Sequence, residues 1–170
     1  MQSLLTRGLA HMPVTRILSP LLISIAVIAA GCNGGGASPG ASGGAAMVSV
    51  SEVELGRVLV DGGGRSLYLF EADTGTKSTC SGPCAAAWPP LLTSGSPTAT
   101  GDAHSSKLGT TARDDGTTQV TYNGHPVYLY AGDKKAGDIS GEGSDAFGAE
   151  WYLLSPDGNK VEEDSEGDES

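Results

Sequence analysis

The sequence predicts a mainly β domain built from two similar repeats. The segments "SLYLFEAD" (66–73) and "PVYLYAGD" (126–133) superimpose with an offset of 60 residues. Each follows another β-like run and a glycine-containing turn, which is the pattern of a β-hairpin. Between residues 48 and 156, no stretch sustains a helical period of apolar residues for more than two turns. We therefore expect two hairpin or meander repeats, at about 55–92 and 107–155, joined about a pseudo-two-fold axis into a small sandwich or open barrel.

The N-terminal residues 1–31 have the features of a secretion signal. Arg7 and Arg16 come without any acidic residue and are followed by the apolar run "ILSPLLISIAVIAAG". The run is shorter than the roughly 20 apolar residues of a transmembrane helix, and a proline interrupts it. Either Met1 or Met12 can serve as the start, because "MPVTR" still supplies a basic residue.

Residues 28–32, "IAAGC", resemble the lipobox of bacterial lipoproteins, in which small residues precede a cysteine that is diacylated and becomes the mature N-terminus. The resemblance implies that Cys32 carries the lipid; the alternative is an ordinary signal peptide that merely ends near a cysteine. Residues 32–47 would then be the lipidated cysteine and a tether rich in glycine, serine and alanine. Two acyl chains give stable anchoring, so we expect the protein on the exported face of the cell membrane.

The C-terminal residues 157–170 contain seven acidic residues and one lysine, and are predicted to be a disordered tail. The remaining residues 48–156 are long enough for one domain with one hydrophobic core. The chain carries 10 Lys and Arg against 20 Asp and Glu, a net charge of −10. Phosphate contacts need a basic patch, so we expect no nucleic-acid partner and contact with the membrane only through the lipid.

The elements of the domain follow from turn residues and apolar runs. The first predicted hairpin, 56–70, turns through Asp61-Gly62, and the second, 117–130, turns through Asn123-Gly124, a pair that favours a type I′ turn. The second strands of both hairpins are apolar on both faces and should be buried on both sides. Further strands are expected at 107–113 and 150–155. A short helix around Cys84–Trp88 should begin at a proline and end before the next one.

These residues resemble a known family, the bacterial secreted-repeat lipoproteins with a tandem Y-x4-D motif, in which a tyrosine, an aromatic residue two positions later and an aspartate recur. The matching positions are Tyr68, Phe70 and Asp73 in the first copy and Tyr128, Tyr130 and Asp133 in the second. The resemblance also covers "CSGPCAAAWPPL" and "GAEWYLL". It implies a fold and an exported location, and it carries over no catalytic or binding residue, because the biochemical role of the family is uncharacterised.

Cys80 and Cys84 are the only cysteines left once Cys32 is acylated. Exported compartments favour oxidised thiols, and a separation of four residues can bring two Cα atoms into disulfide range. We therefore expect a local disulfide that pins the short helix to the β core. The alternative is a redox pair or a Cu(I)-binding dithiol, although the C-x-x-C pattern of thioredoxin-like sites is absent and Met47 is the only methionine after cleavage.

Other candidate residues favour structural roles. Asp73 and Asp133 follow strands, where aspartate commonly turns the chain by accepting backbone N–H groups; a converging carboxylate pair on the pseudo-axis is the alternative. His104 and His125 lie in polar turns without a ligand-like spacing. The loop 133–151 offers oxygen ligands for Ca²⁺ amid glycines but fails the EF-hand pattern. The candidate ligands in this loop are Asp133, Asp138, Glu142 and Asp145.

No nucleophile elbow, phosphate loop or metalloprotease signature occurs in the chain. The prediction is therefore a membrane-anchored, exported lipoprotein that acts without catalysis or cofactor, as a binding or cell-envelope interaction module. Its partner would be an envelope protein or the cell wall. The alternative is an exported redox or copper-handling protein that uses Cys80 and Cys84, with His104 or His125 as a possible further ligand.

Overall fold

The computed structural model describes residues 44–161. Within this range the chain is mainly β, as expected, with three three-stranded sheets and one short α-helix. The elements, in chain order, are β1 (Met47–Val53), β2 (Gly56–Asp61), β3 (Tyr68–Phe70), α1 (Pro83–Ala87), β4 (Thr98–Ala99), the 3-10 turn η1 (Ser105–Lys107), β5 (Leu108–Ala112), β6 (Thr118–Tyr122), β7 (His125–Pro126), β8 (Ser144–Ala146) and β9 (Ala149–Leu153).

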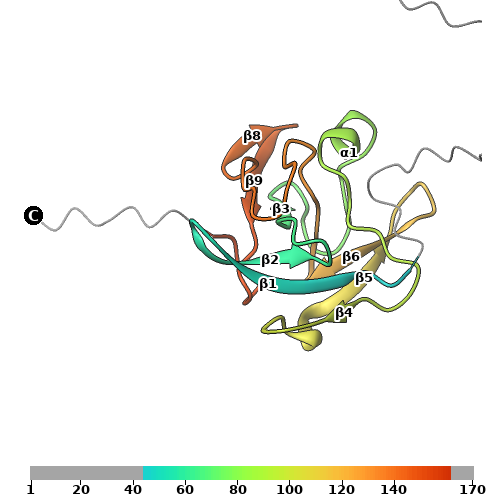
Figure 1. Ribbon diagram of the computed structural model, residues 1–170. Helices are drawn as coiled ribbons and strands as arrows, with labels where there is room; N and C mark the ends of the chain where they lie inside the picture. The colour runs from blue at the N-terminus through green and yellow to red at the C-terminus, as the bar shows by residue number, and fades with distance from the viewer. Residues whose placement is uncertain (1–43, 162–170) are drawn as a thin grey trace, which may run out of the picture. The chain divides into compact units, whose positions relative to one another are not determined.

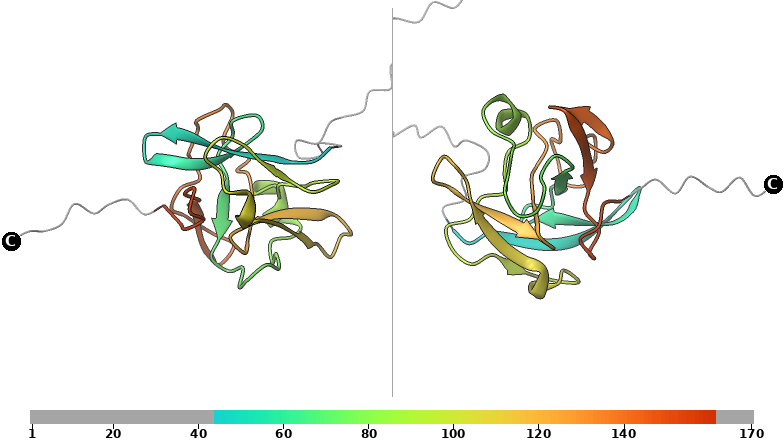
Figure 2. Two further views of the ribbon diagram at one scale, coloured as in Figure 1. Left: turned by 90° about the horizontal axis from the view of Figure 1, so that it is seen from below. Right: turned by 180° about the vertical axis from the view of Figure 1, so that it is seen from behind.

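The strand orders of the three sheets are β2-β1-β4, β3-β9-β8 and β5-β6-β7. All neighbours are antiparallel except β1 and β4, which are parallel. In Figure 1 the long β1–β2 ribbon crosses the middle of the domain, with α1 and the β8–β9 hairpin on one side and β4 and β5 on the other. The view from behind in Figure 2 shows the same separation. Because strand β9 pairs with β3, the end of the second repeat lies against the first.

The two repeats exchange their last strands across a pseudo-two-fold axis. At the axis, Tyr68 and Tyr128 pair with each other, and each backbone N–H donates to the other residue's carbonyl at 2.9 Å. The last strand of the second repeat pairs with Tyr68 through Leu153, and the last segment of the first repeat pairs with Tyr128 through Pro90. The last segment of each repeat therefore pairs with a strand of the other repeat, and neither repeat forms its complete set of strand pairs by itself.

Further hydrogen bonds repeat this exchange on both sides of the axis. Leu154 donates to Leu67 and accepts from Leu59, and the equivalent Leu91 donates to Val127 and accepts from Val120. The four N···O distances lie between 2.7 and 3.2 Å. The pseudo-symmetry predicted from the two motif copies is thus realised in the backbone.

The second predicted hairpin is confirmed and the first is only partly so. Asn123 and Gly124 have φ angles of 50° and 84°, as a type I′ turn requires, and they join β6 to β7. In the first hairpin, Val60 bridges to Ser66 next to the turn, but β3 then leaves β2 to pair with β9. The full partner of β2 is instead β1, a strand that the sequence analysis did not predict.

The folded domain is longer at both ends than the expected range 48–156. Ala46 is 5% exposed, and its N–H donates to Thr93 Oγ1 at 3.0 Å, so the domain includes residues that were assigned to the tether. At the other end, the Val161 N–H donates to the Leu153 carbonyl at 2.8 Å, and Ser155 donates to Asn159. Residues 157–161 therefore belong to the domain. The predicted signal, Cys32 and residues 162–170 lie outside the described range.

The short helix α1 forms where it was expected. Gly82 precedes it with a φ of 54°, Pro83 occupies its first position, and the Trp88 N–H closes it by donating to the Cys84 carbonyl at 2.7 Å. A helix of this length is not stable alone. Its position depends on Trp88, which is 1% exposed and packs in the core.

The core on the α1 side of the domain is a continuous aromatic stack. Trp88 and Trp151 occupy equivalent positions in the two repeats, and their rings are parallel to within 3° at a centroid distance of 4.0 Å. Phe70 stacks on Trp151 at 4.1 Å, and Tyr130 covers Trp88 at 4.4 Å. Offset and edge contacts between aromatic rings add to the free energy gained by burying them. The aromatic residues of both motif copies therefore hold the two repeats together.

Candidate functional site

The tyrosine and aspartate of the repeated motif meet across the pseudo-axis. The Tyr68 hydroxyl donates to Asp133 Oδ2 at 2.7 Å, and the Tyr128 hydroxyl donates to Asp73 Oδ2 at 2.5 Å. Both tyrosines are fully buried, and both aspartates are less than a tenth exposed. Each tyrosine is thus bonded to the aspartate of the other repeat, so the motif functions as a pair of crossed contacts.

The second oxygen of each aspartate organises the loop that follows it. Asp73 Oδ1 accepts the backbone N–H and the hydroxyl of Thr79, at 2.6 and 2.7 Å. Asp133 Oδ1 accepts the same two groups of Ser140, at 3.0 and 2.7 Å. Each carboxylate therefore joins its own loop to the tyrosine of the opposite repeat, and all of the hydrogen-bonding groups involved are satisfied.

Burial raises the pKa of both motif tyrosines well above the usual value of 10, and the hydrogen bond to a carboxylate raises it further. For Tyr68 the carboxylate is Asp133, and for Tyr128 it is Asp73. Both hydroxyls therefore stay neutral at physiological pH. A tyrosine that acts as a base or as a nucleophile needs a lowered pKa, so this environment favours a structural role.

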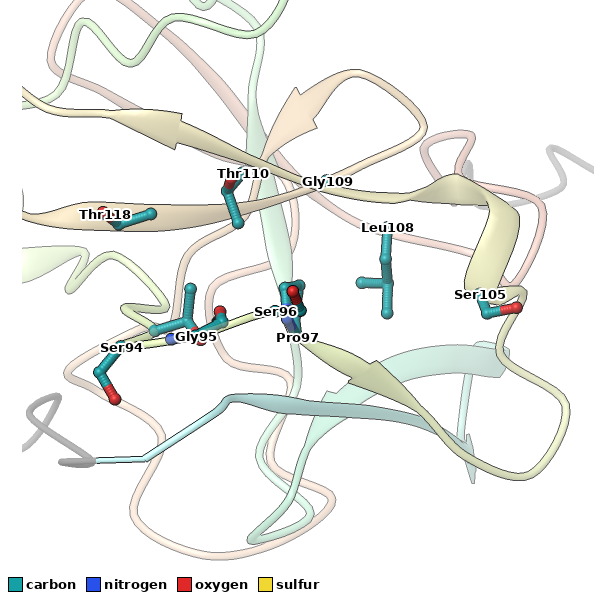
Figure 3. A pocket seen from close by; sticks show the side chains of 10 residues that line it. Ser94, Gly95, Ser96, Pro97, Ser105, Leu108, Gly109, Thr110 and Thr118 are labelled. Carbon is teal, nitrogen blue, oxygen red and sulfur yellow. Dashed lines mark hydrogen bonds between the residues drawn. The ribbon is translucent and has the colours of Figure 1, made fainter.

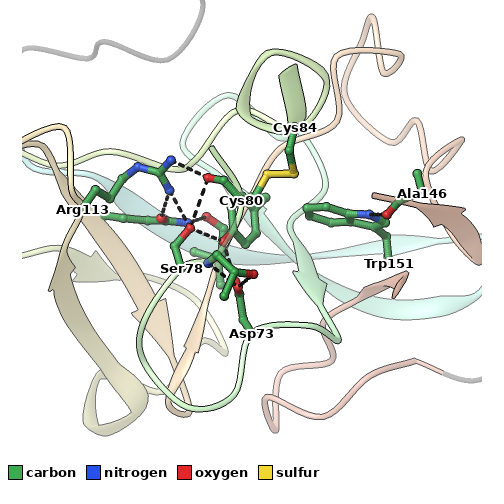
Figure 4. The surroundings of a disulfide bond; sticks show 11 residues. Asp73, Ser78, Cys80, Cys84, Arg113, Ala146 and Trp151 are labelled. Carbon is green, nitrogen blue, oxygen red and sulfur yellow. Dashed lines mark hydrogen bonds between the residues drawn. A yellow bond between two sulfur atoms is a disulfide. The ribbon is translucent and has the colours of Figure 1, made fainter. Parts of the chain in front are cut away.

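A buried arginine extends the polar cluster on the first-repeat side. The Arg113 side chain is 5% exposed and donates to Ser78 Oγ at 2.8 Å, to Gln119 Oε1 at 2.6 Å and to the Cys80 carbonyl at 2.7 Å (Figure 4). Its Nε lies 3.6 Å from Asp115 Oδ2. The sequence analysis did not identify Arg113, because an arginine at the end of a strand is usually solvated.

These contacts form one chain of hydrogen bonds that ends at the motif aspartate. Ser78 Oγ accepts from Arg113 and lies 2.7 Å from the Tyr128 hydroxyl, which donates to Asp73. A hydroxyl has one proton to donate, so the consistent direction runs from Arg113 through Ser78 and Tyr128 to Asp73. The second repeat has no equivalent of this arginine among the described residues that contact Tyr68.

Cys80 and Cys84 lie at disulfide-bonding distance, with Cα atoms 5.3 Å apart. They are 1% and 7% exposed and belong to the same apolar cluster as Trp151 (Figure 4). The pair links the start of α1 to the loop that Asp73 and Arg113 hold. A buried pair of this kind offers little access to a partner protein or a metal ion.

We expect the double variant Cys80→Ser, Cys84→Ser to lose about 2 kcal/mol of unfolding free energy, because a short closed loop removes little chain entropy. It should keep its β circular dichroism spectrum. The measurement is urea unfolding, together with alkylation of the denatured, unreduced wild type, in which both cysteines should stay unlabelled until a reductant is added. Ready labelling of both thiols in protein taken from the cell surface would support the redox or copper alternative.

The acidic loop does not gather its carboxylates at one point. Asp133 is bonded as described above, Asp138 accepts two backbone N–H groups of its own turn, and Glu142 accepts the Leu153 N–H at 2.5 Å. Asp145 is exposed on strand β8. Within residues 44–161, no group of three or more His, Cys, Asp or Glu side chains is placed to hold a metal ion.

The two histidines contact residues other than the cysteines. His104 Nε2 lies 3.8 Å from Asp157 Oδ1 on the surface, and the backbone N–H of His104 donates to the Tyr122 hydroxyl. His125 lies on the short strand β7. Neither side chain is brought to the Cys80–Cys84 pair in the described structure, so the geometry gives a dithiol site no further ligand.

An open groove of about 500 Å³ lies between the β5–β6 ribbon and the segment that leads into β4 (Figure 3). Most of its lining side chains carry hydroxyl groups, and none carries a charge. Leu108 and Pro97 supply apolar surface. The full lining consists of Thr93, Ser94, Gly95, Ser96, Pro97, Ser105, Leu108, Gly109, Thr110 and Thr118. The arrangement suits an uncharged ligand that both donates and accepts hydrogen bonds.

The fold and the site define a class of protein: a duplicated β domain in which two copies of one aromatic and acidic motif bond across the interface of the repeats. The chain belongs to the Lipoprotein_15 family, described as a secreted repeat of unknown function, whose model matches residues 49–92 and 109–155. The family predicted from the motif residues is therefore confirmed, and membership of a secreted-repeat family indicates an exported protein.

No curated protein and no solved structure matches the chain. Within the described residues, no helix is long and apolar enough to cross a membrane.

Proposed function

We propose that this chain is a lipid-anchored protein of the bacterial cell envelope, and that its domain binds an uncharged, hydrogen-bonding polymer such as a glycan strand of the cell wall. The observation that carries the proposal is the hydroxyl-lined groove beside β5. The secreted-repeat family and the lipobox-like "IAAGC" support the location. The buried motif supports binding over catalysis, because its tyrosines and aspartates are engaged with one another.

The anchor is tested by the variant Cys32→Ala, which we expect to abolish acylation and to move the protein from the membrane to the soluble fraction. The physical reason is that two acyl chains give stable membrane binding, whereas the acidic chain has no electrostatic attraction to an anionic bilayer. Detergent phase partitioning and intact mass spectrometry report the outcome. A variant that keeps the mass increment and the detergent-phase partitioning would refute the anchor.

The groove is tested by co-sedimentation of the detergent-solubilised full chain with isolated cell wall. The double variant Ser96→Trp, Thr110→Trp replaces two exposed lining hydroxyls by indoles, and should lower the bound fraction at least tenfold while leaving the unfolding midpoint unchanged. Thr100→Trp is the matched control, because Thr100 is exposed close to β4 but does not line the groove. Equal sedimentation of the wild type, the double variant and the control variant would contradict the proposal.

A further inference from the structure

The tip of the β8–β9 hairpin carries an aromatic residue in an unfavourable backbone conformation. Phe147 and Gly148 have φ angles of 60° and 93°, and they connect Ala146 to its pairing partner Ala149. The left-handed region is costly for residues other than glycine, asparagine and aspartate, because their Cβ crowds the backbone. The domain itself provides the comparison, since the same two-residue turn in the β6–β7 hairpin uses asparagine before glycine.

The Phe147 ring is also exposed. It is 51% exposed, and among the described residues only one other large hydrophobic side chain, Met47, is comparably open. Burial of a phenylalanine side chain stabilises a folded protein, and Phe147 leaves about half of its surface in water in the isolated domain. An asparagine at this turn would relieve the backbone and remove the exposed ring together.

Two carboxylates lie on the arms of the hairpin, within three residues of Phe147 along the chain. Asp145 on β8 lies directly opposite Glu150 on β9, and both are exposed. Like charges at opposed positions of an antiparallel pair destabilise it. The Tyr152 hydroxyl holds one oxygen of Glu150 at 2.8 Å and fixes the position of that carboxylate. The tip therefore combines an exposed apolar side chain with two exposed acidic side chains on the neighbouring strands.

We propose that this hairpin tip is the docking surface for a partner protein that has an apolar pocket bordered by lysine or arginine side chains. Phe147 enters the pocket, and Asp145 and Glu150 meet the basic border. Aromatic anchors that fill a pocket on the partner carry most of the binding free energy of many interfaces. The proposal rests on the proposed function as a binding module, and it adds a second surface besides the groove.

The charge around Phe147 favours a protein over a membrane as the partner of the hairpin tip. An anionic membrane surface attracts basic segments and repels carboxylates placed beside an inserting residue. A basic protein surface gains from both carboxylates, which also steer the encounter at low salt. The two-residue turn fixes the backbone at Phe147 before binding, so little backbone conformational entropy is lost on association.

The test places the photoreactive analogue p-benzoylphenylalanine at position 147 of the full chain in its own cells, with position 114 as the control. Asp114 lies exposed at the tip of the β5–β6 hairpin, away from the proposed surface. We expect a discrete protein adduct from position 147 and none from position 114. Mass spectrometry should place the crosslink in a segment with lysine or arginine neighbours. The double variant Asp145→Asn, Glu150→Gln should reduce the adduct.

The crosslinked protein then serves as the probe for Phe147→Asn. The variant should bind it about thirty-fold more weakly, the loss expected for an interface hot spot. Its unfolding midpoint should rise by about 2–5 °C, because asparagine tolerates the left-handed turn. A merely structural role for Phe147 would lower that midpoint.

The proposal would be overturned by lipid adducts, by equal adducts at both positions, or by the absence of an adduct at position 147. Full affinity of Phe147→Asn for the crosslinked protein would overturn it as well. Cell-wall sedimentation separates this failure from failure of the proposed function. If the groove variant still sediments less with cell wall while the crosslinking and affinity tests at position 147 fail, the docking surface alone is wrong. If both experiments fail, the proposed function is wrong as well.

Discussion

Trp151→Ala is expected to destabilise the domain by about 3–5 kcal/mol, the range for removing a large aromatic side chain from a core. Trp151 is fully buried between Phe70 and Trp88, and its indole N–H donates to the Ala146 carbonyl at 3.0 Å. Alanine would leave a cavity in the middle of the stack and would remove the indole hydrogen bond to Ala146. Domains of this kind have about 5–15 kcal/mol of total stability, so the variant should be close to unfolding at 37 °C.

Urea unfolding followed by circular dichroism measures this loss. The matched control is Glu150→Ala, which changes an exposed residue of the same strand and should shift the unfolding free energy by no more than about 0.5 kcal/mol. A loss below about 1 kcal/mol for Trp151→Ala would show that the aromatic stack does not join the two repeats as described.

Alkaline pH is expected to unfold the domain through the two motif tyrosines. Their pKa values are raised in the folded state, whereas an unfolded tyrosine titrates near 10. Below pH 10 both states hold the hydroxyl protons and stability is unaffected. Above pH 10 only the unfolded state releases them, so stability falls by about 1.4 kcal/mol per pH unit for each tyrosine, or about 5 kcal/mol for Tyr68 and Tyr128 together at pH 12.

The measurement is the unfolding free energy between pH 9 and pH 12, with tyrosinate absorbance recorded in parallel. Tyr128→Phe removes one of the two groups and should roughly halve the tyrosine contribution to the slope, whatever its effect at neutral pH. The absorbance of the wild type should show tyrosines that ionise only as the domain unfolds. Complete tyrosine titration in a still folded protein would contradict the crossed bonds.

The local pattern of the sequence predicts the parts of the fold that depend on neighbouring residues. Asn123-Gly124 predicts its turn, Pro83 predicts the start of α1, and the apolar run of the motif predicts buried strands. Strand β1 was missed although valine alternates with serine at residues 48–51, because the preceding glycine- and alanine-rich segment made the whole region resemble a tether.

The crossed contacts could not be predicted in the same way. The sequence analysis expected the motif aspartates to turn the chain after their strands, whereas the pairing of Tyr68 with Asp133 depends on the register between distant strands. Arg113 was missed for a related reason, since its partners Ser78 and Cys80 come close only after the repeats have packed together. The candidate groove is also a product of tertiary structure, because its lining comes from several separate segments.

The exchange of last strands limits how early the domain can fold, because the chain becomes available from its N-terminal end first. The Leu59 N–H reaches its acceptor, the Leu154 carbonyl, only when the end of the domain has been made, so the first half cannot complete its hydrogen bonds before then. Contacts between such distant residues slow folding, because the intervening chain has to be closed into a loop first. A chain truncated before Trp151 would leave β3 without its antiparallel partner β9 and would expose an apolar edge open to aggregation.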